Sequence, residues 1–136
     1  KRAILEALGD LAPSDTGFAL LHGTATEQND AMEARVMAEL LPGVPAASLK
    51  RAVGHQLAGA GAMNAAAACA LLEKGGKLPN NFFAGERAFA DERLPEAFLK
   101  SLTDSDAPRE LVIPRILVSA FAFGGSNAAL LFEKCL

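Results

Sequence analysis

The feature that most limits how this chain folds is an unbroken apolar run, Phe18 to Leu21, with polar residues directly after it. Such a run, without alternation, is typical of a strand buried on both faces of a parallel sheet. Helical patterns lie on either side of it. Residues 2–9 form one, and Asp30 with Glu33 gives a second helix a capping-box-like start. Strands that alternate with helices predict an α/β fold.

The remaining segments extend this order. We expect a short strand over residues 45–49 and a long Ala/Gly-rich helix that opens at Gly54-His55 and ends near Lys74. Two closing strands are expected near 113–121 and 128–132, joined by the turn at Gly124–Asn127.

Residues 77–110 are expected to be irregular apart from a short helix near 94–102. The prediction for residues 1–136 is one α/β unit. It has a mixed, mostly parallel sheet with an antiparallel edge, flanking helices, and the Ala/Gly-rich helix buried at its centre.

Composition excludes several classes of function. The net charge of −3 and the lack of a basic stripe argue against nucleic acid as a partner. The apolar run from Leu57 to Leu72 is too short and too weakly hydrophobic to span a membrane. The two cysteines, Cys69 and Cys135, have no zinc-site spacing. With no signal peptide visible, we expect a cytoplasmic protein.

The chain has two histidines, and both lie where strand-to-helix logic places functional groups. His22 directly follows the apolar run, and sites in open α/β sheets gather at the C-terminal ends of strands. His55 is expected in the first turn of the long helix, where the helix dipole favours a neutral imidazole. Two neutral rings that donate to one point would stabilise an enolate. The alternative is that each is a hydrogen-bonded structural histidine.

Other side chains near these positions are candidates too. Lys50 is expected either to bias the electrostatics of the histidines or to be a solvated surface lysine. Thr24 and Thr26 flank one residue in a stretch expected to be extended, so their hydroxyls should point the same way and suit a polar ligand, or else cap a turn.

A further candidate is the pair Phe121 and Phe123, which run into Gly124-Gly125. Glycines there permit backbone N–H groups to face a ligand, and a neighbouring phenylalanine would act as a gate. The alternative is a core pair of aromatic rings followed by a simple hairpin.

Three segments in order resemble the elongating β-ketoacyl-[acyl-carrier-protein] synthases, which have the thiolase fold. These segments are His22-Gly23-Thr24-Ala25-Thr26 with Asn29-Asp30 and Glu33, then Lys50–His55 with Ala58–Ala62, then Phe121–Asn127. The resemblance implies that residues 1–136 are the C-terminal half of such a synthase. The family's nucleophilic cysteine belongs to the other half, and the chain, which starts without methionine, is expected to be a piece of something longer.

The resemblance also implies a role for each residue. His22 and His55 would hold the malonyl thioester carbonyl during decarboxylation, and Lys50 would tune them. Asp30 and Glu33 would form a supporting polar network, and Thr24 and Thr26 would meet the phosphopantetheine arm. The Phe123 N–H would complete an oxyanion hole, and its ring would gate the acyl pocket.

The implied reaction is a Claisen condensation between an acyl group and malonyl-ACP with loss of carbon dioxide. It needs no metal and no dissociable cofactor. The implied partners are the acyl carrier protein, the N-terminal half of the same synthase and, for the intact protein, a second copy in a homodimer. The pathway stays open between fatty-acid synthesis and a polyketide-like or aryl-polyene branch.

The chain departs from the family pattern at Val53, which is usually Thr, and at Asn64, where many members have glutamate. Two other functions are kept as alternatives. One is a non-catalytic partner subunit that shapes chain length. The other is a nucleotide-binding domain built on the glycines of residues 59–64, although the third glycine of that motif is missing.

Overall fold

The structure is a computed structural model that describes residues 1–74 and 114–135. The expected short helix near 94–102 lies outside the described residues. The helices and strands that bear on the site are α1 (Arg2–Leu8), β1 (Phe18–Leu20), α2 (Glu27–Leu40), β2 (Ala46–Ala47), α3 (Lys50–Val53), α4 (Ala60–Glu73), β3 (Arg115–Phe121) and β4 (Asn127–Glu133).

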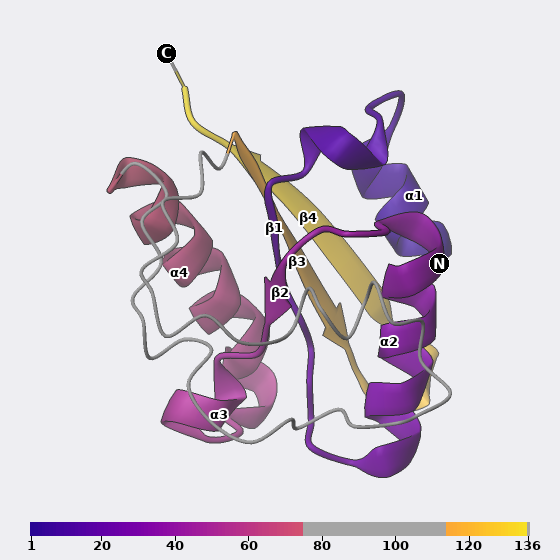
Figure 1. Cartoon of the computed structure of the whole chain (residues 1–136). Coiled ribbons are helices and arrows are strands. Elements are labelled where there is room, and N and C mark those ends of the chain that lie inside the picture. The colour runs from indigo at the N-terminus through magenta and orange to yellow at the C-terminus, as the bar shows by residue number, and fades with distance from the viewer. Residues whose placement is uncertain (75–113, 136) are drawn as a thin grey trace.

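The strands form a four-stranded sheet in the order β2-β1-β3-β4 (Figure 1). β1 is parallel to both neighbours, with Ala19 opposite Ala46 on one side and Leu117 on the other. β4 is antiparallel to β3. The predicted mixed, mostly parallel sheet with an antiparallel edge is therefore confirmed. β1 is apolar throughout because both of its faces are covered.

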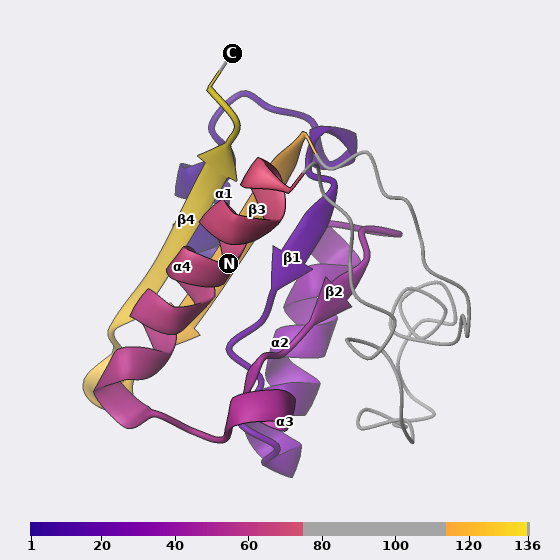
Figure 2. The ribbon, with the colours of Figure 1, turned by 90° about the vertical axis from the view of Figure 1, so that its left-hand side faces the viewer.

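Helices cover both faces of the sheet, with more helices on one face than on the other. α1 and α2 lie on one face and α4 on the other, as Figure 1 and the turned view in Figure 2 show. Alternate residues of β1 divide between two clusters: Ala19 packs with α1 and α2, whereas Phe18 and Leu20 pack with α4. β1 is therefore packed between two apolar layers. Its last residue lies at the C-terminal edge of the sheet, where the loop that carries His22 begins.

α2 begins earlier than the sequence predicted. Its first residue is Glu27, and Thr26 is the N-cap without a side-chain capping bond. Asp30 and Glu33 are not the start of the helix but lie on its buried side, 8% and 2% exposed. Their carboxylates accept hydrogen bonds from the loop after β1 rather than from the first turn of their own helix.

The predicted long helix from Gly54 is also corrected. The chain forms the single turn of α3, breaks at Gly54, where φ is +76°, and resumes with a 3₁₀ turn at Leu57–Gly59 before α4. His55 thus lies between two helical segments rather than inside one. The argument that placed it in the first turn of a long helix is wrong, because a left-handed glycine ends α3 just before it.

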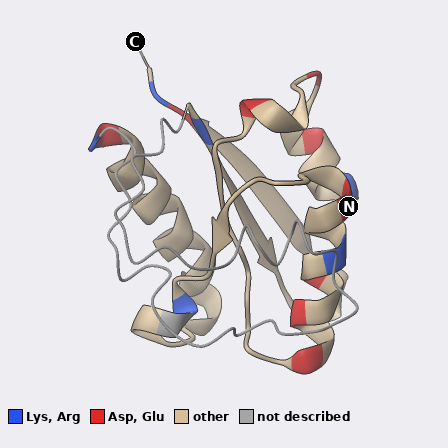
Figure 3. Ribbon diagram, in the orientation of Figure 1, with Lys and Arg blue, Asp and Glu red and all other residues tan. Residues whose placement is uncertain are grey.

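The Ala/Gly-rich helix α4 buries one stripe and exposes the rest. Ala60, Asn64, Ala68, Leu71 and Leu72 are buried, whereas Met63 is 42% exposed. Figure 3 shows that charged residues are spread along α1 and α2, whereas α4 is charged only at its C-terminal end. In the part of the chain that the structure describes, no helix combines the length and apolar character needed to cross a membrane.

Candidate active site

Three segments meet at the C-terminal edge of β1. They are the loop that starts at His22, the connection from α3 to α4 that carries His55, and the end of β3 at Phe121. The rings of His22 and His55 lie 6.2 Å apart between centroids and are perpendicular. The ring of Phe121 lies 5.3 Å from that of His22. The two histidines that the sequence singled out are therefore brought together.

Lys50 fixes the protonation of His22. Its Nζ lies 3.3 Å from His22 Nδ1 and also donates to the His22 carbonyl oxygen. An ammonium group has donors only, so Nδ1 is the acceptor and the ring proton is on Nε2. Burial is the main cause that lowers the pKa of His22 to about 4, and the positive charge of Lys50 and the neighbouring His55 contribute to the same shift. His22 is a neutral Nε2–H donor at neutral pH.

His55 has the same tautomer for a different reason. The backbone N–H of Leu57 donates to its Nδ1 at 2.9 Å. In a neutral ring this leaves the proton on Nε2. Leu57 begins the 3₁₀ turn ahead of α4, so His55 caps an N–H that the helical backbone leaves unpaired. Both rings therefore have Nδ1 occupied and Nε2 available as a donor.

Glu33 anchors the backbone that carries His22. Its Oε1 accepts from the His22 N–H at 2.9 Å and from the Ser119 hydroxyl at 2.7 Å, and its Oε2 accepts from the Gly23 N–H at 2.8 Å. Burial raises the pKa of Glu33, and the hydrogen bonds from Gly23, Ser119 and His22 oppose that rise. These contacts fix the loop because three donors share one buried carboxylate.

Gly23 and Ser48 lie too close for any other residue to replace the glycine easily. Gly23 has φ +41°, and a Cβ built there would lie 2.5 Å from the Ser48 Cβ. The Ser48 hydroxyl donates to the Gly23 carbonyl at 3.1 Å, and the Lys50 N–H lies 3.4 Å from the same hydroxyl. The serine thus joins the His22 loop to the helix that carries Lys50.

Thr24 and Thr26 point the same way, as predicted, although the chain between them is not extended. Their hydroxyl oxygens are 2.8 Å apart, and Ala25 between them has φ +60°. The Thr24 N–H donates to Asp30 Oδ1 at 3.0 Å. Burial raises the pKa of Asp30, and hydrogen bonds from Thr24 and Ala25 and the charge of Lys50 oppose the rise. Asp30 therefore supports this bend and does not cap α2.

Lys50 lies at the first residue of α3, close to two carboxylates. Burial lowers the pKa of its ammonium group, and Glu33 and Asp30 raise it. Two acids of α2 thus act electrostatically on one partly buried cation beside His22.

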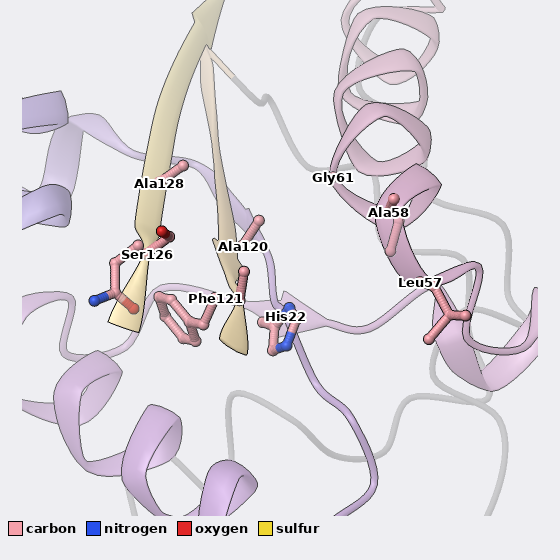
Figure 4. A pocket seen from close by; sticks show the side chains of 11 residues that line it. His22, Leu57, Ala58, Gly61, Ala120, Phe121, Ser126 and Ala128 are labelled. Carbon is pink, nitrogen blue, oxygen red and sulfur yellow. The ribbon is translucent and has the colours of Figure 1, made fainter. Parts of the chain in front are cut away.

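The turn between β3 and β4 separates its two phenylalanines. Phe121 lies beside His22 (Figure 4), whereas the Phe123 ring is fully exposed and does not contact that ring pair. Gly124 and Gly125 have φ of +79° and +84°, and the Ala122 N–H donates to the Ser126 carbonyl at 2.8 Å. Both positions have a left-handed backbone conformation, which glycine adopts without strain.

A hollow of about 260 Å³ opens beside His22. Figure 4 shows His22 between Phe121 on one side and the segment from Leu57 to Gly61 on the other. Small residues such as Ala58, Ala120 and Ala122 form much of its wall. The hollow is an apolar recess with one imidazole at its edge.

Sequence reasoning missed two polar residues of this site, Ser48 and Ser119, and noted Asn64 only as a departure from the family pattern. Ser119 lies within the apolar strand β3, and Asn64 lies on the buried stripe of α4. A polar residue inside an otherwise apolar segment is the signal that identifies both, since a buried polar group needs a partner. Ser48 carries no comparable signal.

The nucleotide-binding alternative can be compared with the geometry. The segment 59–64 follows a 3₁₀ turn rather than a strand, so the nucleotide-binding alternative lacks the strand-to-helix turn on which that motif depends. Among the described residues, no group of three or more His, Cys, Asp or Glu side chains could hold a metal ion.

Comparison with known proteins defines the class. Residues 1–82 match the family described as "Beta-ketoacyl synthase, C-terminal domain". The chain is 33% identical over 136 residues to the squalestatin tetraketide synthase clz2 of Cochliobolus lunatus, covering 91% of this chain and 5% of that protein. It is 30% identical over 143 residues to the putative mitochondrial 3-oxoacyl-[acyl-carrier-protein] synthase of Schizosaccharomyces pombe, covering 100% of this chain and 32% of that protein.

The fold agrees with the sequence match. The structure of the ketosynthase ApeO in complex with its chain length factor ApeC, from Xenorhabdus doucetiae, superimposes with a TM-score of 0.78 at 32% identity, covering 96% of this chain and 31% of that chain. The fold is thus that of the thiolase-like ketosynthases. The chain belongs to the β-ketoacyl synthase family and contains its C-terminal domain. It spans about a third of the length of the Schizosaccharomyces pombe relative and a twentieth of the length of the Cochliobolus lunatus relative.

Proposed function

We propose that this chain is the part of a β-ketoacyl-ACP synthase that activates the malonyl unit for decarboxylative condensation. The observation that carries the proposal is the close pair of histidine rings, each with a hydrogen-bond donor at its Nδ1 atom. An oxygen in hydrogen-bond contact with a ring nitrogen lies about 4 Å from the ring centroid. One oxygen can therefore reach both rings only if their centroids are less than about 8 Å apart. The centroids of His22 and His55 are 6.2 Å apart.

The chemistry follows from this placement. The thioester carbonyl oxygen of malonyl-ACP accepts from Nε2–H of His22 and of His55. The bond between the α-carbon and the carboxylate breaks, carbon dioxide leaves, and the electron pair moves into the enolate that the two donors stabilise. The enolate carbon then attacks the acyl thioester on the synthase cysteine, the new carbon–carbon bond forms, and the cysteine leaves as thiolate.

Lys50, Asp30 and Glu33 act in this proposal through His22. Lys50 keeps its ring neutral and fixes the tautomer, and the two carboxylates balance the lysine charge. Thr24 and Thr26 meet the phosphopantetheine arm with their paired hydroxyls. The backbone N–H of Phe123 supports the tetrahedral intermediate, with the glycine pair Gly124-Gly125 allowing its approach. The Phe123 ring gates the acyl pocket.

Partners and domain organisation are part of the same proposal. The acyl carrier protein delivers both substrates, and the cysteine comes from a part of the synthase outside residues 1–136. The intact synthase is a cytoplasmic homodimer that needs no metal or dissociable cofactor. The 136-residue chain by itself therefore catalyses no condensation, and turnover by the purified chain would contradict this division of labour.

The exposed apolar side of α4 is evidence that another segment of the synthase covers this helix in the intact protein. Met63 is 42% exposed and Cys69 on the same helix is exposed, and Leu57 in the 3₁₀ turn before α4 is 72% exposed. An apolar surface of this kind favours burial against another surface, and alone it favours self-association. In a Cys135→Ser background, a maleimide should react with Cys69 in the 136-residue chain and much more slowly in the intact synthase. Equal reaction rates would remove this support.

The decisive test uses His55 in the intact synthase. His55→Ala should abolish malonyl decarboxylation, measured by release of labelled carbon dioxide, while acyl loading on the cysteine continues. His55→Asn is the matched control, because it keeps one N–H donor and should retain part of the activity. If decarboxylation survives His55→Ala, the role of the histidine pair is wrong.

The same assay separates the second candidate function, a non-catalytic partner that shapes chain length. Such a partner has no use for two enolate-stabilising donors, so its His22→Ala and His55→Ala variants would leave the activity of the complex unchanged. Retention of both rings with matching tautomers favours the synthase.

A further inference from the structure

Asn64 is a buried polar residue that none of the roles above uses. It lies on the stripe of α4 that faces the sheet and is 4% exposed. Its neighbours on that stripe are apolar, so the amide is the exception on this face of the helix. A buried amide without partners is costly, and this one has a defined partner.

That partner is the backbone of the residue before His22. Asn64 Nδ2 donates to the Leu21 carbonyl oxygen at 3.1 Å, and the bond joins residues 43 apart in the chain. Leu21 itself is 1% exposed. The hydrogen bond therefore ties α4 to the C-terminal end of β1 at the point where the chain turns into the histidine loop.

The other anchors of this loop come from different elements. Glu33 of α2 and Ser119 of β3 hold the His22 N–H, and Lys50 of α3 holds the His22 carbonyl. Asn64 adds the tie from α4, which is separated from His55 only by Gln56 and the 3₁₀ turn Leu57–Gly59. Lys50 thus relates His22 to the helix before His55, and the Asn64 amide relates the strand end before His22 to the helix after His55.

We propose that Asn64 is a positioning residue that sets the separation of the two histidine rings by holding α4 against the strand end that carries His22. The proposal rests on the proposed function for its catalytic consequence. Its structural consequence is independent of that function. The carbonyl of Leu21 accepts only from a donor, so an amide satisfies it and an ionised carboxylate of the same shape repels it.

Two variants test the proposal. Asn64→Ala removes the amide in a helix that is already rich in alanine, where alanine favours helix formation. Asn64→Asp keeps the shape and loses the donor when ionised. The matched control is Ala68→Gly, one turn further along the buried stripe, which weakens α4 without removing a polar contact.

The first measurement is the side-chain nitrogen NMR spectrum of the histidines in the 136-residue chain. With two histidines in the sequence, a His55→Ala spectrum assigns both sets of signals. In Asn64→Ala and Asn64→Asp, the His22 signals should shift and broaden because the ring loses its fixed contact with Lys50 and its neighbours. In Ala68→Gly they should stay unchanged even though the melting temperature falls.

The second measurement is the split of activities in the intact synthase. A misplacement of about 1 Å can cost about 100-fold in rate. Asn64→Ala should therefore slow malonyl decarboxylation about 10- to 100-fold at saturating malonyl-ACP while acyl loading stays within about twofold. Ala68→Gly should leave both rates near those of the unmodified synthase.

The outcomes separate the positioning role from the proposed function. Unchanged His22 signals and an unchanged decarboxylation rate in both Asn64 variants would overturn the positioning role. An unmodified synthase that does not decarboxylate malonyl-ACP would overturn the proposed function, while the His22 signals would still decide the role of Asn64. If circular dichroism shows that one variant has not folded, the other variant decides between the outcomes.

Discussion

The Gly23→Ala substitution tests the packing that holds the histidine loop, because its cost has two parts that can be worked out separately. The first is backbone strain. Gly23 has φ +41°, and a residue with a Cβ at such an angle costs about 1–2 kcal/mol. The second is a clash. The added Cβ would lie 2.5 Å from the Ser48 Cβ and 2.6 Å from its hydroxyl oxygen, against about 3.5–4.0 Å for a normal contact.

Forcing an extra methyl group into a packed site costs about 1–3 kcal/mol. Gly23→Ala should therefore lower the free energy of unfolding by about 2–5 kcal/mol. Gly43→Ala is the matched control. Gly43 has φ +79°, and no atom lies within 4 Å of its added Cβ, so this change should cost only the backbone part of about 1–2 kcal/mol. Effects of alanine on the unfolded chain are shared by both variants and cancel in the difference.

The assay is urea denaturation of the 136-residue chain, with the slope checked for each variant. Ser48→Gly removes both clashing atoms, so the double variant Gly23→Ala with Ser48→Gly should recover the steric part. The coupling energy from that cycle should be about 1–3 kcal/mol. The reasoning fails if Gly23→Ala is no more destabilising than Gly43→Ala, or if the cycle shows no coupling.

Three further predictions concern the charges and polar contacts around the site. An NMR titration should give His22 a pKa near 4, below the 6.5 of an unfolded histidine, and Lys50→Met should raise it. The unfolded chain binds the His22 proton more readily than the folded chain does. The contribution of His22 to the free energy of unfolding is therefore complete above about pH 6.5 and is lost as the pH drops towards 4. Because the ring is partly exposed and screened by solvent, the loss should be about 1–2 kcal/mol. A pKa at the ordinary histidine value would contradict the effect assigned to burial and to the charge of Lys50. Ser119→Ala should cost about 1–3 kcal/mol in urea denaturation, since it removes a donor from buried Glu33. Ser14→Ala, at an exposed turn, should change stability by less than about 0.5 kcal/mol, and equal losses would count against the network. Glu133→Ala breaks the exposed cross-strand pair with Arg115 and should lower the free energy of unfolding by less than about 1 kcal/mol. Added salt should reduce this loss. A larger loss that does not depend on salt would mean that the pair is part of the core.

The His22 titration also bears on the mechanism. Burial and the positive charge of Lys50 both lower the pKa of His22 and so favour the neutral ring. If Lys50→Met raises the pKa of His22 towards its ordinary value, the intact synthase should lose decarboxylation at the acid end of its pH profile sooner than the unmodified protein does. A pH profile that does not move would assign Lys50 a structural role alone.

The layer architecture and the candidate site residues could be predicted from the amino-acid sequence. The apolar run Phe18–Leu21 indicates a parallel strand because both of its faces are buried, and burial on both faces leaves a direct mark on composition. His22, Lys50 and Phe121 were singled out from their place after strands and beside glycines. The structure brings them into contact at one edge of the sheet.

The tertiary structure alone decided which side chains serve as anchors. Asp30 and Glu33 look like a capping box because their spacing fits one. In the structure, the N–H of Thr24 donates to Asp30 and the N–H of Gly23 donates to Glu33, and Thr26 is the N-cap of α2. Ser119 and Asn64 acquire partners 86 and 43 positions away in the chain. Local pattern records propensity and burial, whereas a hydrogen bond between distant segments depends on how the layers pack, so only the folded chain specifies it.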